Sequence, residues 1–491
     1  MVAVKGLYIL AAVMLALYGI QALVLCYLSL RHRRDVLSCP ELDDWPSVTI
    51  QLPTYNEYFV AERLLRAVTR MVYPREKLQI QVLDDSTDDT TQLLEREVGR
   101  CRAAGLTIEL LHRVDRVGFK AGALKEGLEK ASGEVICIFD ADFVPPADFL
   151  LRTVPYLMAD PQLALVQARW GHLNAKCSTL TRAQALALDT HFMIEQFGRQ
   201  RGGLFMPFNG TAGIWRREAI EAAGGWQSDT LCEDLDLSYR AQTAGWRCLF
   251  LPEVEAPAEL PPQMAALKRQ QARWAQGSIQ CLLKLCRPVL GARVALSKRL
   301  MGLAHLCSYG MHPFVLVILL CALPLLAREG QIRVPILTYL GVAGFGPPLA
   351  QILGQRALHR DWPRRLLYLP FLLMLGTGLS WQNTVAVFKA LTGQKTAFLR
   401  TPKFELTPDA RAWRVNRYAL GLDLSNAGEL MLMAYSGLTI LVAIAQGSYL
   451  TIPFLLMYFC GFAYVGLYDV WQNWRLATRR PQDGRLSPQA F

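Results

Sequence analysis

The sequence of 491 residues predicts two structural classes in one chain: an α/β domain with a Rossmann-like, mainly parallel sheet, and an all-α transmembrane bundle. Hydrophobic residues make up 52% of the chain and charged residues only 19%, whereas a soluble domain has about 25% charged residues. Between residues 46 and 280, five apolar runs of strand length alternate with helical patterns, and long apolar segments precede and follow that region. The five runs, each predicted to form a strand, are "SVTIQLP", "LQIQVLDD", "LTIELLHR", "EVICIFDAD" and "LALVQAR". Such alternation predicts parallel strands with helices on both faces of the sheet.

The N-terminal unit is predicted to be one transmembrane helix, residues 1–34. Residues 6–30 carry no charge, and about 20 apolar residues suffice to cross a bilayer. Arginines cluster at 31–34 and only Lys5 precedes the segment, so the positive-inside rule predicts that the following domain, 46–280, is cytosolic. The twelve cysteines include no C-x-x-C pair, which is typical of reduced thiols in a reducing compartment.

The C-terminal half is predicted to lie mostly in the membrane. Residues 281–300 form a basic amphipathic stretch, which predicts a helix along the membrane surface. A C-terminal transmembrane region at 301–475 and a basic cytosolic tail at 476–491 follow. The apolar segments of this region are 302–327, 335–353, 366–390, 429–446 and 449–471.

The basic loops at 356–365 and 395–417 complicate the predicted topology. Both favour the cytoplasm, yet a single apolar segment separates them. One element between them is therefore predicted to be re-entrant or interfacial. The polar sequence "SWQNTVAVFKAL", residues 380–391, is the best candidate for the interfacial part.

Carboxylates gather where the predicted strands end. The runs "SVTIQLP", "LQIQVLDD" and "EVICIFDAD" end at or just before acidic residues, and ligands of parallel sheets bind at the carboxyl ends of strands. Asp140 and Asp142 form a D-x-D pair suited to Mg²⁺ or Mn²⁺, which also take substrate phosphates. The alternative for an isolated D-x-D pair is a solvated turn or a helix cap. Further acidic pairs at Asp84–Asp85 and Glu233–Asp234 favour the metal interpretation.

Two other patterns suggest ligand contacts. Lys120 opens a glycine-punctuated helix in "GFKAGAL", where a cation and free N–H groups could meet a diphosphate. The chain contains neither G-x-G-x-x-G nor a P-loop motif, which argues against dinucleotide and P-loop chemistry. In "KRQQARWAQGS", Trp274 suits a sugar face and Arg273 a phosphate, with Gln270 one turn earlier. The alternative is an ordinary turn of an amphipathic helix.

Together these motifs resemble the processive membrane glycosyltransferases of family 2. The motifs are "LPTYNE", "QVLDDSTD", "GFKAGALKEGL", "FDADF", "LALVQARW", "FNGTAGIWRREAI", "AGGW", "CEDLDLSYRA" and "RQQARWAQG". The strongest likeness is to the plant cellulose-synthase-like A and C groups and their bacterial relatives, which make β-mannan, glucomannan or β-1,4-glucan. The resemblance covers about residues 46–285 and implies a GT-A fold.

The resemblance also implies a role for each matching residue. Asp234 would be the general base, and Asp140 and Asp142 would bind Mn²⁺ or Mg²⁺. Cys232 departs from the Thr or Val common before this Glu-Asp pair. The nucleotide sugar would be bound by Asn56, Glu57, Asp84, Asp85, Lys120, Thr401 and Lys403. The growing polysaccharide would be held by Phe208, Asn209, Gly210, Glu233, Gln270, Arg273 and Trp274.

Thr401 and Lys403 rest on a shorter match in the membrane half. "FLRTPK", residues 398–403, resembles the gating loop F-x-V-T-x-K of cellulose synthases, with Arg400 where valine is usual. The alternative is a basic juxtamembrane loop without a part in binding.

The sequence therefore predicts an inverting glycosyltransferase, because inverting transfer needs one base and one Lewis acid. It would use GDP-mannose or UDP- or GDP-glucose to elongate a β-linked polysaccharide, expected to be β-1,4, and help move it across the membrane. The alternatives are a non-processive transferase acting on a lipid acceptor, and a transporter or structural membrane protein, which would leave the acidic clusters unexplained. The expected location is the bacterial inner membrane, with several spanning helices.

The expected partners are the nucleotide sugar, the polysaccharide and membrane lipid, but not nucleic acid. The net charge is +11, and a basic chain could in principle bind nucleic acid. Its basic residues, however, cluster beside apolar runs, as in "LSLRHRRD" and "NWRLATRRPQDGR". That arrangement is typical of anchoring next to anionic lipid.

Overall fold

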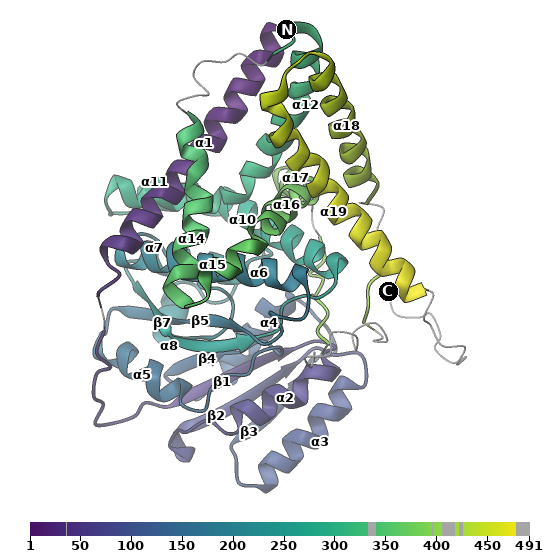
Figure 1. Cartoon of the computed structure of the whole chain (residues 1–491). Helices are drawn as coiled ribbons and strands as arrows, with labels where there is room; N and C mark the ends of the chain where they lie inside the picture. The colour runs from purple at the N-terminus through teal and green to yellow at the C-terminus, as the bar shows by residue number, and fades with distance from the viewer. Residues whose placement is uncertain (36, 332–339, 395, 405–417, 422–425, 478–491) are drawn as a thin grey trace.

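The computed structural model places a sheet domain at one end of the molecule and long apolar helices at the other (Figure 1). It describes residues 1–491 except 36, 332–339, 395, 405–417, 422–425 and 478–491. Most of the basic loop predicted at 395–417 and of the tail predicted at 476–491 therefore lies outside the described residues.

A seven-stranded sheet organises the predicted catalytic domain, with the order β3-β2-β1-β4-β6-β5-β7. Strands β1 to β4 run parallel, β6 runs antiparallel between β4 and β5, and β7 is parallel to β5. The predicted, mainly parallel sheet is confirmed, and β6 and β7 add to the five predicted strands. The strands are β1 Val48–Thr54, β2 Leu78–Asp84, β3 Ile108–His112, β4 Val135–Ile138, β5 Leu163–His172, β6 Gly213–Arg216 and β7 Arg247–Ala258.

Helices cover both faces of this sheet. In β4, Val135 and Cys137 join one hydrophobic core, and Ile136 and Ile138 join the other. Burial on both faces explains why the strand is continuously apolar rather than alternating. The first core includes α2 Tyr58–Val68, α3 Thr90–Ala103 and α5 Phe149–Ala159; the second includes α4 Phe119–Lys130, α7 Phe197–Arg201, α8 Arg217–Ala222 and α9 Glu233–Thr243.

The sheet topology brings two acidic segments to one edge. Strands β1 and β4 are parallel neighbours, and Gln51 pairs with Ile138 near their carboxyl ends. From this pair the strand order continues in opposite directions, to β2 and β3 on one side and to β6, β5 and β7 on the other. In open α/β sheets, ligands bind beyond the carboxyl ends of the two strands at such a point, here β1 and β4. Glu57, Asp140 and Asp142 follow these two strand ends.

One long helix connects the sheet domain to the apolar helices. Helix α10 runs from Met264 to Gly291 without interruption, and α11 follows at Leu296–Leu306. The stretch predicted as a separate unit at 281–300 thus spans the end of α10 and the start of α11. Leu285 is buried in a core shared with these helices, so this part of α10 packs against protein on one face.

Five helical segments are long and apolar enough to cross a membrane among the described residues. They are Val2–Arg31, Ser308–Glu329, Trp362–Leu391, Asn426–Ala445 and Tyr449–Arg475. The expected all-α bundle is thus present, with α12 Met311–Glu329, α16 Leu369–Gly378, α17 Ser380–Leu391, α18 Asn426–Ala445 and α19 Ile452–Ala477.

The apolar segment predicted at 335–353 is not among these five. Residues 332–339 lie outside the described part, and α14, Gly346–Leu358, packs against α6, Thr179–Thr190. The two helices approach closely at Gly354, because a Cβ added to Gly354 would lie 3.0 Å from the Cα of Thr190. Residues 380–391 form α17, which packs on α10 and α12; their interfacial placement stays a prediction.

Candidate active site

A pocket lies beyond the carboxyl ends of β1 and β4, between the sheet, α10 and residues 398–403. Its walls come from segments far apart in the sequence, which is why no single motif could reveal it. The predicted site residues that line it are Glu57, Asp85, Lys120, Asp140, Asp142, Asn209, Gly210, Glu233, Asp234, Gln270, Arg273, Trp274, Thr401 and Lys403.

Lys120 occupies the middle of the acidic side of this pocket. Its Nζ lies 2.5 Å from Asp140 Oδ1 and 3.9 Å from Glu233 Oε1, and it donates a hydrogen bond of 2.8 Å to the carbonyl oxygen of Gly210. Burial alone would lower the pKa of Lys120, but Asp140 and Glu233 outweigh it and raise that pKa. The lysine therefore stays charged inside the pocket.

Asp234 lies in the first turn of α9, where the helix dipole favours a negative charge. Burial raises the pKa of Asp234 to about 7, and the neighbouring Glu233 adds to the rise while Lys120 opposes it. A carboxyl group with a pKa near the working pH is suited to accept a proton during a reaction.

A second ion pair closes the other side of the pocket. Lys403 Nζ lies 2.5 Å from Asp142 Oδ2, and both side chains are largely buried. Beside them, Arg400 lies 3.5 Å from Glu57, whose pKa rises to about 8 because of burial. The segment resembling a gating loop therefore already lies over the D-x-D pair.

The D-x-D pair fits a divalent cation that is completed by substrate. Among the described residues no three His, Cys, Asp or Glu side chains group as a metal site. Asp140 and Asp142 supply two carboxylates, and Mg²⁺ is commonly held by one or two carboxylates together with substrate phosphates. Among the described residues, the lysine ion pairs use Oδ1 of Asp140 and Oδ2 of Asp142, so the other oxygen of each carboxylate could face a cation.

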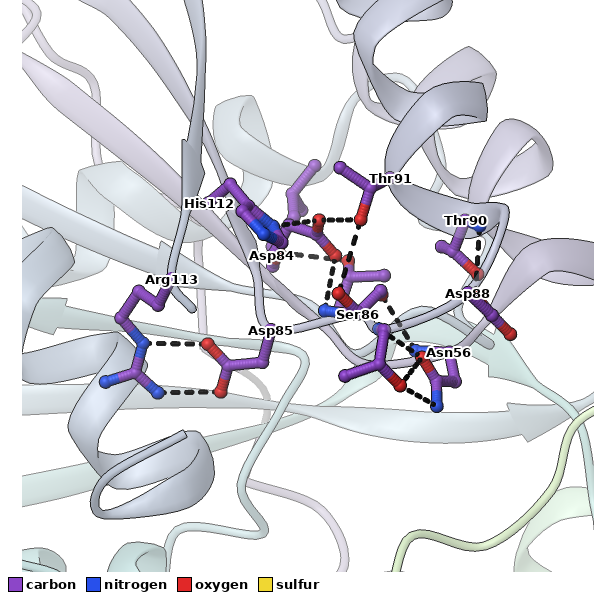
Figure 2. Close-up of polar contacts among 12 residues, drawn as sticks. Asn56, Asp84, Asp85, Ser86, Asp88, Thr90, Thr91, His112 and Arg113 are labelled. Atoms are coloured by element: carbon purple, nitrogen blue, oxygen red, sulfur yellow. Dashed lines mark hydrogen bonds and ion pairs between the residues drawn. The ribbon is translucent and has the colours of Figure 1, made fainter. Parts of the chain in front are cut away.

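Two predicted nucleotide-binding residues, Asp84 and Asn56, lie outside the pocket lining, and Figure 2 shows their polar contacts. Asp84 is fully buried, and its Oδ2 accepts a hydrogen bond of 2.7 Å from Thr91 and lies 2.8 Å from His112 Nδ1. Asn56 Oδ1 accepts a 2.8 Å hydrogen bond from the backbone N–H of Thr87. These contacts hold the loops after β2 and β1, and the role of Asp84 and Asn56 in binding the nucleotide sugar stays a prediction.

Phe208, predicted to line the acceptor site, also lies outside the pocket. Its side chain is 1% exposed and meets Trp215 edge to face, with ring centroids 5.5 Å apart. The aromatic side chain belongs to the second hydrophobic core of the sheet domain. The next two residues, Asn209 and Gly210, line the pocket.

Asp85, by contrast, lines the pocket and is held rigidly. Arg113 donates two parallel hydrogen bonds to it, 2.7 Å from Nε to Oδ1 and 2.6 Å from Nη2 to Oδ2 (Figure 2). Bidentate pairs of this kind fix orientation as well as charge.

The structure adds lining residues that the sequence did not suggest. The Arg116 guanidinium lies 3.4 Å from the ring centroid of Tyr55 and 6.0 Å from that of Phe398. Tyr55 lies in the motif "LPTYNE" directly after β1, and its place at a strand end could have predicted it as a site residue. Arg116 lies in the loop between β3 and α4, where no motif indicates a binding residue. His172 also lines the pocket, and its Nε2 lies 3.0 Å from Asp189.

Six buried polar atoms of pocket-lining residues lack a hydrogen-bond partner within the described protein: Glu57 Oε2, Arg116 Nε, Trp170 Nε1, Arg273 Nε, Arg400 Nη1 and Thr401 Oγ1. Arg273 Nε and Thr401 Oγ1 are the two donors among them that lie in the segments predicted to bind substrate. An unpaired buried donor costs about 1 to 3 kcal/mol, so groups of this kind point to a ligand that completes them. Both donors suit the oxygens of an anionic or hydroxyl-rich ligand.

Comparison with known proteins identifies the family. A model described as glycosyltransferase like family 2 matches residues 46–277. The probable glucomannan 4-beta-mannosyltransferase 9 of Oryza sativa subsp. japonica is 33% identical over 450 residues, covering 87% of this chain and 84% of that protein. The chain belongs to glycosyltransferase family 2.

Other relatives of this family 2 glycosyltransferase match mainly its sheet domain. Glucomannan 4-beta-mannosyltransferase 9 of Arabidopsis thaliana is 44% identical over 250 residues, covering 50% of this chain and 47% of that protein. The chain spans about half the length of most of the curated relatives it matches. These relatives are plant proteins, so the predicted bacterial inner membrane stays a prediction.

A solved structure supports the fold. A mannosyltransferase from Pyrobaculum calidifontis, in complex with GDP-Man and Mn²⁺, superposes with a TM-score of 0.55 at 23% identity, covering 79% of this chain and 100% of that chain. At this level of identity the likeness shows the fold, and the predicted GT-A class is confirmed.

Two glycines allow the acidic side of the glycosyltransferase site to close. Gly210 has a φ of 81°, and a Cβ built there would lie 2.7 Å from Asp234 Oδ2 and 3.5 Å from Lys120 Nζ. Gly277 of α10 lies against Cys232, where a Cβ would be 2.4 Å from the sulfur. Because neither glycine has a side chain, the backbone at Gly210 can approach Asp234 and the backbone at Gly277 can approach Cys232.

Proposed function

We propose that this family 2 glycosyltransferase transfers a hexose, with inversion, from a nucleotide-diphosphate sugar to the end of a growing β-linked polysaccharide. The proposal rests on one pocket in which the buried carboxyl of Asp234 stands beside Lys120 and the D-x-D pair. The names of the relatives favour mannose and a β-1,4 linkage, and the solved structure that shares the fold holds GDP-Man, so GDP-mannose is the proposed donor. UDP-glucose and GDP-glucose are the alternative donors.

Asp234 would act as the general base. As the acceptor hydroxyl oxygen bonds to the anomeric carbon, its proton passes to the carboxylate of Asp234. The bond from that carbon to the diphosphate oxygen breaks, and the electron pair leaves with the nucleoside diphosphate. One displacement of this kind inverts the anomeric centre and requires no nucleophile from the protein.

The opposite side of the pocket would bind the leaving group. Asp140 and Asp142 would hold Mn²⁺ or Mg²⁺, which when bound supplies Lewis-acid stabilisation of charge on the diphosphate. Lys120 and Lys403 lie next to these carboxylates and would contribute two further positive charges. Thr401 would donate its unpaired hydroxyl to the same oxygens.

The acceptor end would lie along α10. Trp274 lines the pocket and is only partly buried against the core that contains Cys232, and its indole would stack on a sugar ring. Arg273 and Gln270 would hydrogen-bond the sugar hydroxyls. The candidate spans that contain α17 and α19 pack on this helix, and the five spans would provide a route for the polymer across the membrane.

Product analysis with labelled donors tests the proposal. Purified full-length protein is incubated with radiolabelled GDP-mannose, UDP-glucose or GDP-glucose, and the product is sized. We expect polymer from GDP-mannose, and Asp234→Asn should lower turnover by about 10² to 10⁴-fold while nucleotide binding persists. A single sugar on a lipid would establish the non-processive alternative, and an Asp234→Asn variant with a tenth or more of wild-type turnover would reject this base.

Metal removal tests the D-x-D assignment separately. EDTA should reduce donor binding and turnover together, and added Mn²⁺ or Mg²⁺ should restore both. Asp142→Ala should show the same combined loss without recovery on metal addition, because a ligand is gone. Undiminished turnover in excess chelator would contradict the assignment.

A further inference from the structure

A second cavity, of about 680 Å³, lies where the first predicted membrane helix meets the sheet domain. Its size is within the usual range for small-ligand sites. It is lined by the end of α1, Val2–Arg31, and residues that follow it, by α14, by α7 and the helical turn before it, and by α5 and β7. Figure 1 shows α1 descending beside α14 to this junction. None of its lining residues lines the active-site pocket.

Arginines dominate the charge of this cavity. Arg33, Arg201 and Arg356 line it, and in the described part of the chain none of the three lies within 4.0 Å of a carboxylate. Arg201 donates only to the backbone oxygen of Asp35, at 3.1 Å, and its buried Nε has no partner there. The Asp35 carboxylate is itself engaged by His32 at 2.7 Å. Arg152 lines the cavity as well, and Asp35 and Glu253 are the carboxylates among its lining residues, so the lining carries more positive than negative charge.

Apolar side chains line the cavity beside these arginines, and they continue along the membrane helix. Phe197 and Leu353 line the cavity, with the Arg201 guanidinium 5.5 Å from the Phe197 ring centroid, and Leu30 lines it at 43% exposure. On α1, Tyr27 lies three residues before Leu30 and is 60% exposed, and Val24 lies six residues before it and is 37% exposed. In a membrane span, this exposed stripe faces the lipid chains and ends at the cavity.

We propose that this cavity binds the phosphate headgroup of an anionic glycerophospholipid at the membrane interface. Arginine is the side chain best suited to phosphate, and basic residues directly after a membrane helix attract anionic lipid. The acyl chains would follow the stripe that ends at Leu30, while Arg33, Arg201 and Arg356 would converge on the phosphate. The bound lipid would join α1 and α14 to the sheet domain.

Native mass spectrometry of the purified full-length protein in neutral detergent tests this site. The protein is titrated with phosphatidylglycerol, with phosphatidylcholine and, in a separate arm, with glycerol 1-phosphate. We expect preferential binding of phosphatidylglycerol, weakened about tenfold or more by Arg33→Gln and by Arg356→Gln, because each removes a charge-assisted hydrogen bond. Both side chains are exposed and lack ion-pair partners within the described residues, so the variants should fold.

Matched controls separate the cavity from general membrane charge. Arg34 and Arg360 are exposed arginines near the same two helix ends but do not line the cavity. Arg34→Gln and Arg360→Gln should bind phosphatidylglycerol within about twofold of wild type. Equal weakening by all four substitutions, equal binding of phosphatidylcholine, or equally tight binding of glycerol 1-phosphate would each overturn the proposed lipid site.

Discussion

The Asp234 carboxyl links the structure of the site to a pH dependence. Burial, followed by the charge of Glu233, raises its pKa to about 7. As the proposed general base, Asp234 must be ionised, and one pH unit below its pKa only about a tenth of such a group is ionised. We therefore expect kcat/KM to rise between pH 6 and pH 8 and to level off above that, as measured by initial rates at saturating metal.

The same shift predicts how an Asp234→Asn variant should unfold. The folded-state pKa of Asp234 lies above the ordinary value of about 3.9, so its contribution to stability falls as the pH rises from about 4 to about 7. Asparagine has no charge to bury, so the variant avoids the free-energy cost of an ionised Asp234. Its melting temperature at pH 8 should be no lower than that of wild type. A flat rate profile from pH 6 to pH 8, or an unfolded variant, would contradict this account of the base.

Gly210 tests how tightly the site is packed around Asp234. A Cβ would lie 2.7 Å from Asp234 Oδ2, and the positive φ of 81° adds strain. Gly210→Ala should lower kcat/KM by about 10²-fold, the usual effect of displacing a catalytic group by about 1 Å. Gly225→Ala is the matched control, since its φ is 69° but a Cβ there meets nothing within 4 Å. Comparable losses in both variants would indicate backbone strain alone.

Helix α10 positions three predicted acceptor residues, and its approach to α9 depends on Gly277. A Cβ at this position would lie 2.4 Å from Cys232 Sγ and 2.9 Å from its backbone nitrogen. Gly277→Ala should therefore push α10 away, destabilise the protein by about 1 to 3 kcal/mol and reduce acceptor use more than donor binding. Thermal unfolding in detergent and donor titration measure the two effects.

Gly291 supplies the control on the same helix. A Cβ there meets nothing within 4 Å, and alanine favours a helix over glycine by about 1 kcal/mol. Gly291→Ala should leave turnover unchanged and the melting temperature equal or slightly higher. If Gly277→Ala behaves like Gly291→Ala, the contact with Cys232 does not position α10.

At the scale of the whole molecule, one buried lysine joins the sheet domain to the apolar helices. Lys268 of α10 is 3% exposed, and its Nζ lies 2.8 Å from Glu429 Oε1 of α18, 2.5 Å from Asn426 Oδ1 and 3.8 Å from Asp469 Oδ2 of α19. A buried pair contributes little net stability when intact, but removing one partner leaves the other charge uncompensated.

Lys268→Met should therefore destabilise the full-length protein by about 3 to 5 kcal/mol. Chemical unfolding in detergent measures the change. Arg287→Met, on the same helix but at an exposed position, should stay within about 0.5 kcal/mol of wild type. An unchanged Lys268→Met variant would show that α10 is held to the apolar helices by other contacts.

Local sequence patterns explain why five strands could be predicted and two could not. Continuous apolar runs such as "VICI" indicate a strand buried on both faces. β7 carries Pro252 and Pro257, which argue against a strand interior, and it lies at the edge of the sheet, where proline is tolerated. β6 has only four residues and begins with Gly213, so its pattern is too short to recognise.

The amino-acid sequence by itself determined the class of the domain, the apolar helices and the acidic residues at the strand ends, because periodicity and composition act locally. Only the tertiary structure decided which of those residues share a pocket: it gathers Asp140, Lys120 and Asp234 but turns Asp84 inward. It also paired Lys403 with a carboxylate 261 positions away. Such pairings depend on how helices and strands pack across the whole chain, and a local pattern specifies which face is buried but not the partner it meets.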